Sequence, residues 1–138
     1  VGFGEPWFEG IEPALARALM AIPAARAVEF GRGVNAGLMR GSKHNDSWGE
    51  EMSLSEGADG ALGGMASGAP IHVRVTFKPP SGISKPQETF NQVTGMMEEL
   101  AIKGRHDPVI GPRARPVVEA VARLVIADLG IQGGYIDG

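Results

Sequence analysis

The sequence contains no cysteine, so disulfide bonds and thiolate metal sites are excluded. It also has no long apolar run, and its apolar stretches are far too short to span a bilayer. The net charge of −3 provides no general attraction to nucleic acid. The first ten residues, VGFGEPWFEG, are neither basic nor continuously apolar, so they do not resemble a signal peptide. These absences favour an ordinary globular domain without a membrane or nucleic-acid partner.

The composition is sufficient for one domain with a core. Over 138 residues, 43% are apolar and 21% are charged, and both values are usual for globular proteins. The chain opens on Val1 without a helix cap or an initiator methionine, which suggests the middle of a longer polypeptide. We expect one domain over residues 1–130, followed at residues 131–138 by a tail that is disordered or artificially added.

Apolar residues at helical spacing mark the beginning and the end of the chain. Near the beginning they are Ile11, Leu15, Leu19 and Ile22. We expect a helix over residues 12–21, with Pro13 in its first turn and Pro23 ending it. A second helix is expected from Pro116 to a cap at Gly130, with Glu119 and Arg123 as an i,i+4 ion pair. Its aliphatic residues cover two faces, which indicates neighbours on more than one side.

Strands are expected between these helices. Residues 24–30 and 72–77 favour strands, the second because polar and apolar residues alternate in HVRVTF. A short strand is expected around residues 37–40. The run MMEELA has helical propensity, whereas LAIK at residues 100–103 alternates, and we favour a strand there. This order lacks βαβ alternation and predicts an α+β fold of antiparallel strands packed against helices on one face.

One loop concentrates chemistry-bearing residues. The stretch KGRHDPVIGPRAR brings cations, a histidine and Asp107 close together. Arg105 with Arg113 or Arg115 could hold a phosphate through paired N–H bonds, and Asp107 could orient Arg105 or exchange a proton. The residue types alone leave a solvated loop with local ion pairs equally open.

Other candidates give weaker signals. The glycine-rich stretch GALGGMASG would let a ligand approach the backbone, but it has neither dinucleotide-binding nor P-loop spacing, and taken alone it favours a flexible turn. His44 and Asp46 lack a second histidine at ligand spacing, so no metal site is expected.

Four stretches together resemble one family. They are GFGEPWFEGIEPALARALMAIPAARAVEFG, RGSKHND, GGMASGAPIHVRVTFKPPSGI and KGRHDPVIGPRARPVVEAVARLVIADL. In this order they resemble the C-terminal part of chorismate synthases, from about Gly2 to Leu129.

The resemblance implies a lyase of the shikimate pathway, which leads to the aromatic amino acids. Such an enzyme converts 5-enolpyruvylshikimate 3-phosphate to chorismate and inorganic phosphate by an anti-1,4-elimination that requires reduced FMN. It further implies a cytoplasmic homotetramer with a β-α-β sandwich fold, in which a helical layer lies between antiparallel sheets. Whether the parent enzyme reduces its own flavin with NADPH is left open.

The resemblance also implies site residues. The catalytic residues would be Arg105, which meets flavin and substrate phosphate, and Asp107, near the flavin N5. The cofactor-binding residues would be Pro23, Ala24, Gly63, Lys78, Pro79, Pro80, Ser81, Gly82 and Arg105. We expect the charges to line a dry pocket, where their field is strong.

Departures from the family pattern limit what the chain can do. Gly82 stands where a hydroxyl residue is usual, so one flavin hydrogen bond would be lost. The two catalytic histidines, the substrate-binding arginines and an Arg-Ser-Ser flavin motif of such enzymes have no counterpart here. We therefore expect this chain alone to be inactive. The alternative is a non-enzymatic module that binds flavin or phosphate.

Overall fold

The computed structural model describes residues 2–47 and 59–137. Two longer helices, short helical turns and three pairs of strands follow one another in the order η1 (Trp7–Glu9), α1 (Ile11–Met20), β1 (Ala25–Phe30), η2 (Gly33–Leu38), α2 (Gly41–His44), β2 (Ala61–Leu62), β3 (Met65–Ala66), β4 (Val73–Phe77), β5 (Gln87–Asn91), β6 (Met96–Leu100) and α3 (Gly111–Gln132). All three strand pairs, β1–β4, β2–β3 and β5–β6, are antiparallel. The α+β fold predicted from the sequence is confirmed.

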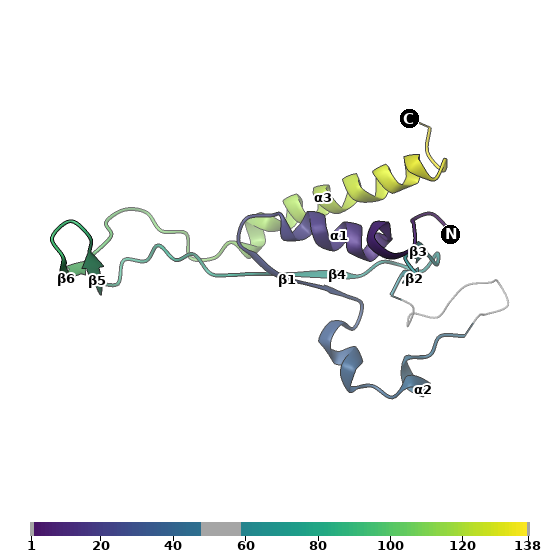
Figure 1. Cartoon of the computed structure of the whole chain (residues 1–138), viewed down its shortest axis with the longest axis horizontal. Coiled ribbons are helices and arrows are strands. Elements are labelled where there is room, and N and C mark those ends of the chain that lie inside the picture. Colours follow the sequence, from purple (N-terminus) through teal and green to yellow (C-terminus); the bar gives the residue numbers. More distant parts are fainter. Residues whose placement is uncertain (1, 48–58, 138) are drawn as a thin grey trace.

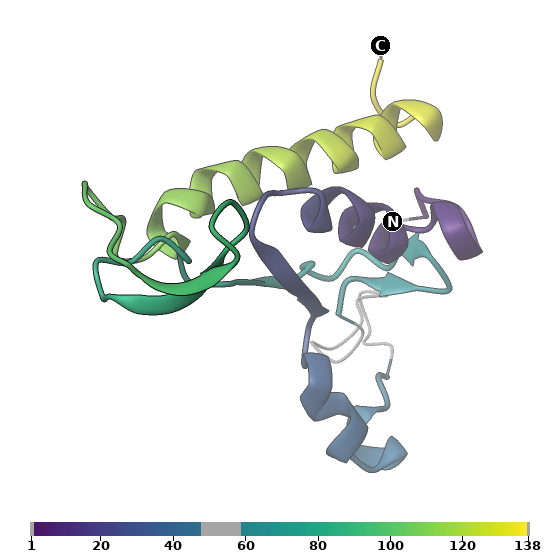
Figure 2. The same ribbon diagram turned by 60° about the vertical axis from the view of Figure 1, so that its left-hand side comes forward.

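The body of the molecule is one sheet covered by two helices. Figure 1 shows α1 and α3 side by side on the same side of β1 and β4. In β4 the side chains alternate as the sequence predicts, with Val73, Val75 and Phe77 half-buried and Arg74 and Thr76 exposed. The short helical segments η2 and α2 extend from the end of β1 away from α1 and α3 (Figure 2).

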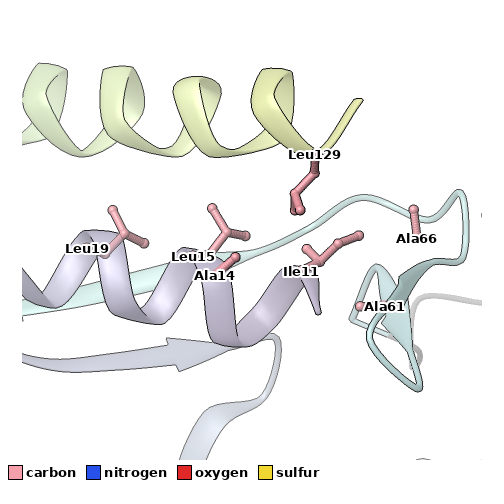
Figure 3. Packing of buried hydrophobic residues seen from close by; sticks show 7 residues of the cluster. All are labelled: Ile11, Ala14, Leu15, Leu19, Ala61, Ala66 and Leu129. Atoms are coloured by element: carbon pink, nitrogen blue, oxygen red, sulfur yellow. The ribbon is translucent and has the colours of Figure 1, made fainter. Parts of the chain in front are cut away.

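The core lies between α1, α3 and the small β2–β3 hairpin. Ile11, Leu15 and Leu19 are the largest fully buried side chains, and all three come from the face of α1 that the periodicity predicts. They meet Leu129 of α3, together with Ala61 and Ala66 of the β2–β3 hairpin (Figure 3). The expected helix over residues 12–21 is confirmed within one residue at each end.

A glycine in the β2–β3 turn allows this packing. The Gly64 carbonyl accepts a hydrogen bond of 2.9 Å from the Ile11 N–H at the start of α1. Gly64 has a φ of +91°, and a Cβ there would lie 2.3 Å from the Glu5 carbonyl oxygen. Only glycine therefore fits between the turn and the beginning of α1.

Two local predictions are wrong. Residues 37–40 form no strand, because η2 continues to Leu38 with short-range hydrogen bonds from Asn35 to Arg32 and from Met39 to Ala36. The η2 segment GVNAGL contains an alanine, two glycines and one β-branched residue, so little favours an extended chain. On α3 the ion pair is Arg115–Glu119, at 3.0 Å, instead of Glu119–Arg123.

The terminal helix is longer than the sequence predicts and is covered on one side. It begins at Gly111, so that Pro112 occupies the first turn and Pro116 lies inside the helix. Val118 and Val125 pack against the core cluster, whereas Val117 and Leu124 are 47% and 69% exposed. The second neighbour expected for this helix is thus not formed by the described residues. None of the helices in the described ranges is long and apolar enough to cross a membrane.

The end of the chain folds back beside α3. Tyr135 lies against Phe3, with 5.9 Å between the ring centroids, and its N–H donates to the Gly130 carbonyl over 2.8 Å. The division into residues 1–130 and a separate tail stays a prediction.

The β5–β6 hairpin stands apart from the body (Figure 1). Of its strand residues only Thr89 and Asn91 are half-buried. Asn91 donates to Glu98 over 2.9 Å, and this bond lowers the pKa of the Glu98 carboxyl. A strand leading towards residues 100–103 was expected, but it ends at Leu100, and its partner β5 was not expected.

A cross-strand ion pair on the main sheet gives a pH-dependent prediction. The Arg74 Nη1 donates to Glu29 over 3.0 Å, and the Val34 N–H donates to the same carboxylate over 3.3 Å. The hydrogen bond from Arg74, followed by that from Val34, lowers the pKa of the Glu29 carboxyl. A depressed carboxyl pKa adds stability above the unfolded value of about 4.3, and this stability is lost as the pH falls through the folded pKa.

Glu29→Gln should therefore lower the melting temperature at pH 7 and have a smaller effect at pH 3. Thermal unfolding of both proteins across this range measures the difference. Arg74→Gln should give a similar loss at pH 7, and the double variant should lose less than the sum of the two. An equal effect of Glu29→Gln at every pH would contradict the assignment.

Candidate functional site

The antiparallel register of β1 and β4 brings two of the expected cofactor segments together. Pro23 and Ala24 precede β1, and Lys78 follows β4, so both lie at the same end of the sheet. The Lys78 N–H donates to the Ala24 carbonyl over 2.9 Å. Ala24 has a φ of +70°, a left-handed conformation that costs a residue with a Cβ about 1 kcal/mol. Strain of this kind is often found at ligand sites, which makes this turn a candidate.

The charged loop is organised around Asp107. Its two carboxylate oxygens accept hydrogen bonds from Arg105, at 3.1 Å, and from Arg113, at 3.2 Å. Arg113 comes from the first turn of α3, so the helix fixes one side of this cluster. Two guanidinium groups face one carboxylate, which leaves a net positive charge suited to an anion.

This cluster is open to solvent in the described chain. The side chains of Arg105 and Arg113 are 84% and 70% exposed, and that of Asp107 is 45% exposed. The dry pocket expected around these charges is therefore not formed by the described residues alone. Such ion pairs contribute little to stability while they are hydrated.

A histidine of the charged loop lies beside the Lys-Pro-Pro-Ser-Gly bend. The Nε2 atom of His106 lies 3.2 Å from the Ile102 carbonyl oxygen, which closes the loop on itself. Its Nδ1 atom faces Gly82, where a Cβ would lie 3.6 Å away. This contact places the bend, including Pro79, Pro80 and Ser81, near the loop that holds Arg105 and Asp107. No spacing in the sequence predicts this neighbourhood.

Gly63 lies apart from the other candidates. It belongs to the turn between β2 and β3, which adjoins the beginning of β4 through the close approach of Gly60 to Ile71. The charged loop and the bend instead follow the end of β4, so the two groups occupy opposite ends of that strand (Figure 1). Gly63 has a φ of +61°, and a Cβ there would meet nothing within 4 Å. The expectation that the glycine turn and the charged loop line one cavity is not met by the described residues.

The structure selects one of two alternative arginines. Both Arg113 and Arg115 were candidates to act with Arg105, and only Arg113 contacts Asp107. Arg115 is engaged by Glu119 one helical turn later. The i,i+4 spacing of Arg115 and Glu119 was a signal that could have assigned Arg115 to the helix surface.

A second acidic group lies elsewhere in the fold. Burial raises the pKa of the Glu12 carboxyl, and the charge of Asp59 raises it further. His44 lies 4.0 Å from Asp59. Among residues 2–47 and 59–137, no three histidine or acidic side chains are placed to hold a metal ion.

Comparisons with known proteins agree on one family. The family model described as chorismate synthase matches residues 1–131. The chorismate synthase of Aeropyrum pernix is 50% identical over 132 residues, which are 93% of this chain and 35% of that protein. The chorismate synthase of Methanosarcina mazei is 47% identical over 140 residues, covering 99% of this chain and 38% of that protein.

The fold gives the same result. A crystal structure of chorismate synthase superimposes with a TM-score of 0.71 at 29% identity, covering 96% of this chain and 34% of that one. The chain thus spans somewhat more than a third of the length of these relatives.

Proposed function

This chain belongs to the chorismate synthase family, and from that membership we propose that it forms the C-terminal part of a chorismate synthase. The reaction is the anti-1,4-elimination of phosphate from 5-enolpyruvylshikimate 3-phosphate, which gives chorismate and needs reduced FMN. In this proposal the chain contributes one wall of the active site, and the opposite wall belongs to the part of the family's length that the chain does not span.

One observation supports this proposal above the others. Asp107 is held between Arg105 and Arg113, beside the bend that ends at Gly82. The family resemblance implies contact with flavin or phosphate for Arg105, Asp107 and Gly82, and the structure adds Arg113 to this cluster. His106 of the same loop lies beside this bend, so the charged cluster and the bend are neighbours in space.

The residues present fit the cofactor in charge and in space. FMN carries a phosphate, and Lys78, Arg105 and Arg113 are cations suited to anionic groups. Gly82 keeps the bend free of a side chain, whereas Gly63 lies at the opposite end of β4 and does not adjoin these cations. When bound, reduced FMN supplies electron density to the substrate as the phosphate leaves.

The chain's own side chains would then do two things. Arg105 would hold the leaving phosphate by paired N–H bonds, because a guanidinium matches the spacing of phosphate oxygens. Asp107 would hold a proton at a carboxylate oxygen close to the cofactor. Both functions need water to be excluded, because charge interactions are stronger in a dry site. The proposal therefore requires that the opposite wall of the active site shields Arg105 and Asp107 from water.

The chain alone is expected to make no chorismate. Its charged cluster is solvated, and the chain has no counterpart of the two catalytic histidines that such enzymes use. The test is an anaerobic assay with reduced FMN and 5-enolpyruvylshikimate 3-phosphate, following chorismate by absorbance. As a positive control, the complete Aeropyrum pernix enzyme should react under the same conditions. Turnover by this chain above the background of buffer would refute the expectation.

The alternative function is a non-enzymatic module that binds flavin or phosphate. The solvent-open cluster around Asp107 could bind an anion without catalysing a reaction. A fluorescence titration with FMN separates the two proposals. Micromolar binding by this chain that is lost in Arg105→Ala favours the module, whereas binding only after the missing part is supplied favours the enzyme.

The remaining properties follow from family membership and are proposed with it. The substrate is 5-enolpyruvylshikimate 3-phosphate, the assembly is a homotetramer, and the compartment is the cytoplasm. Sedimentation of the complete enzyme tests the assembly.

A further inference from the structure

The loop between β6 and α3 keeps its shape without main-chain hydrogen bonds. Among the described residues, no backbone group of 102–108 bonds to another backbone group. Gly104 lies inside this loop with a φ of +137°, a conformation that favours glycine, and a Cβ there would meet nothing within 4 Å. The backbone at Gly104 is therefore free to move unless side chains restrain the loop.

Side chains anchor the loop in two directions. Asp107 accepts a hydrogen bond from Arg113 in the first turn of α3, and Pro108 restricts the preceding backbone to extended conformations. On the other side, the Nε2 atom of His106 lies 3.2 Å from the Ile102 carbonyl oxygen. Because a carbonyl oxygen only accepts, Nε2 carries the proton of this bond. Two consecutive residues thus hold the loop, one to α3 and one to the chain that leaves β6.

Arg105 lies between the histidine anchor and the glycine. Its side chain is 84% exposed and meets Asp107 over 3.1 Å. An ion pair between hydrated side chains is weak and does not by itself fix a guanidinium group. The bond from His106 to Ile102 encloses residues 103–105, so the backbone that carries Arg105 depends on this bond.

The bend after β4 leaves room for the imidazole ring. His106 is half-buried, whereas its neighbours Arg105 and Asp107 are exposed. A Cβ on Gly82 would lie 3.6 Å from the Nδ1 atom of the ring, so the bare glycine backbone lies beside it. The ring therefore occupies a defined place from which it can hold the loop.

We propose that His106 is a positioning residue for the elimination reaction. Its bond to the Ile102 carbonyl closes residues 102–106 and holds Arg105 where the guanidinium meets the leaving phosphate. His106 itself contacts neither substrate nor cofactor. The inference rests on the proposed function of Arg105, but the closed loop is a property of this chain and is measured separately.

Backbone ¹⁵N relaxation of the chain alone tests the closed loop without any chemistry. In His106→Ala, the order parameters of the Gly104 and Arg105 amides should fall below about 0.6, the range of flexible backbone, from higher values in the original chain. His106→Gln places an amide N–H group about as far from Cα as Nε2 and should keep both amides ordered. His106→Asn is too short to reach Ile102 and should behave like alanine.

The same variants test the effect on the reaction. The measurement uses a chimera in which the chain replaces the matching segment of the Aeropyrum pernix enzyme, assayed anaerobically with reduced FMN. His106→Ala should lower kcat/KM at least about ten-fold, because a displacement of about 1 Å in a positioned group can cost on the order of 10²-fold. His106→Gln should recover most of the rate, and His106→Asn should not.

A double variant shows whether His106 acts through Arg105. Once Arg105→Ala has removed the guanidinium, adding His106→Ala should lower kcat/KM by less than about two-fold further, since coupled residues are not additive. His72→Ala is the matched control. His72 is an exposed histidine just before β4, and its replacement should change neither the loop order nor the rate.

Three results would overturn the inference. Equal order of the loop in the original chain and in His106→Ala would show that the histidine does not hold it. Recovery of the rate by His106→Asn but not by His106→Gln would assign a direct ligand contact to Nδ1, and full additivity with Arg105→Ala would remove the coupling. An inactive chimera with the original sequence would instead refute the proposed function, and the relaxation data would then decide whether His106 positions Arg105.

Discussion

Replacing Arg105 with alanine should lower kcat/KM for chorismate formation by about 10²- to 10³-fold, the usual loss when a fixed charge or hydrogen-bond donor for a developing anion is removed. The measurement uses the chimera in which this chain replaces the matching segment of the Aeropyrum pernix enzyme, assayed anaerobically with reduced FMN. The reason is that Arg105 is one of the two arginines held at Asp107 and the one proposed to meet the phosphate. Arg105→Lys should recover only part of the loss, because an ammonium group cannot make paired bonds.

Arg115→Ala is the matched control for this prediction. Arg115 is as exposed as Arg105, at 81% and 84%, and carries the same charge, but its partner is Glu119 on the helix surface. Its removal should change kcat/KM by less than about two-fold, since exposed pairs of this kind are weak. Equal losses from Arg105→Ala and Arg115→Ala would mean that general positive charge, rather than a phosphate contact, explains the effect.

Replacing Gly64 with alanine should destabilise the chain by about 3 kcal/mol. The φ of +91° disfavours any residue with a Cβ, and the added atom would lie 2.3 Å from a backbone oxygen of Glu5, which cannot rotate away as a side chain can. The bond from Ile11 to the Gly64 carbonyl would be disturbed at the same time. Urea unfolding followed by circular dichroism gives the free energy of unfolding of both proteins.

Gly63→Ala separates the cost of the positive φ from the cost of the steric clash. Gly63 also has a positive φ, of +61°, but a Cβ there meets nothing within 4 Å. Alanine at this position should therefore cost only about 1 kcal/mol, the conformational part. If both variants lost the same stability, close packing of the β2–β3 turn against α1 would not be the cause.

Periodicity predicted the parts of the fold that bury side chains. The spacing of Ile11, Leu15 and Leu19 located α1, and the alternation in β4 located the sheet, because in both cases burial itself sets the pattern. The beginning of α3 was placed too late, at Pro116, because a proline inside a helix resembles a proline at its start. The β5–β6 hairpin was only half predicted, because it buries almost no side chains and so leaves no burial pattern in the sequence.

The candidate site was predicted in its residues but not in its arrangement. Family resemblance named Asp107 and Arg105, and the structure adds that Arg113 completes the cluster. The link between His106 and Gly82 depends on how two loops meet in space, and no spacing in the sequence encodes that distance. The separation of Gly63 from the charged loop likewise follows from the direction of β4, which the sequence does not specify.

The contact between Ala24 and Lys78 passes entirely through main-chain atoms. Neither side chain takes part in holding these two segments at a fixed separation, so both are free to serve a ligand or to be exchanged for others. What the position of Ala24 does restrict is backbone shape, because its φ of +70° admits glycine or asparagine easily and disfavours valine or isoleucine. Variation there should consequently be limited by branching at Cβ and hardly at all by polarity, a tolerance that a saturation library at this single codon would reveal.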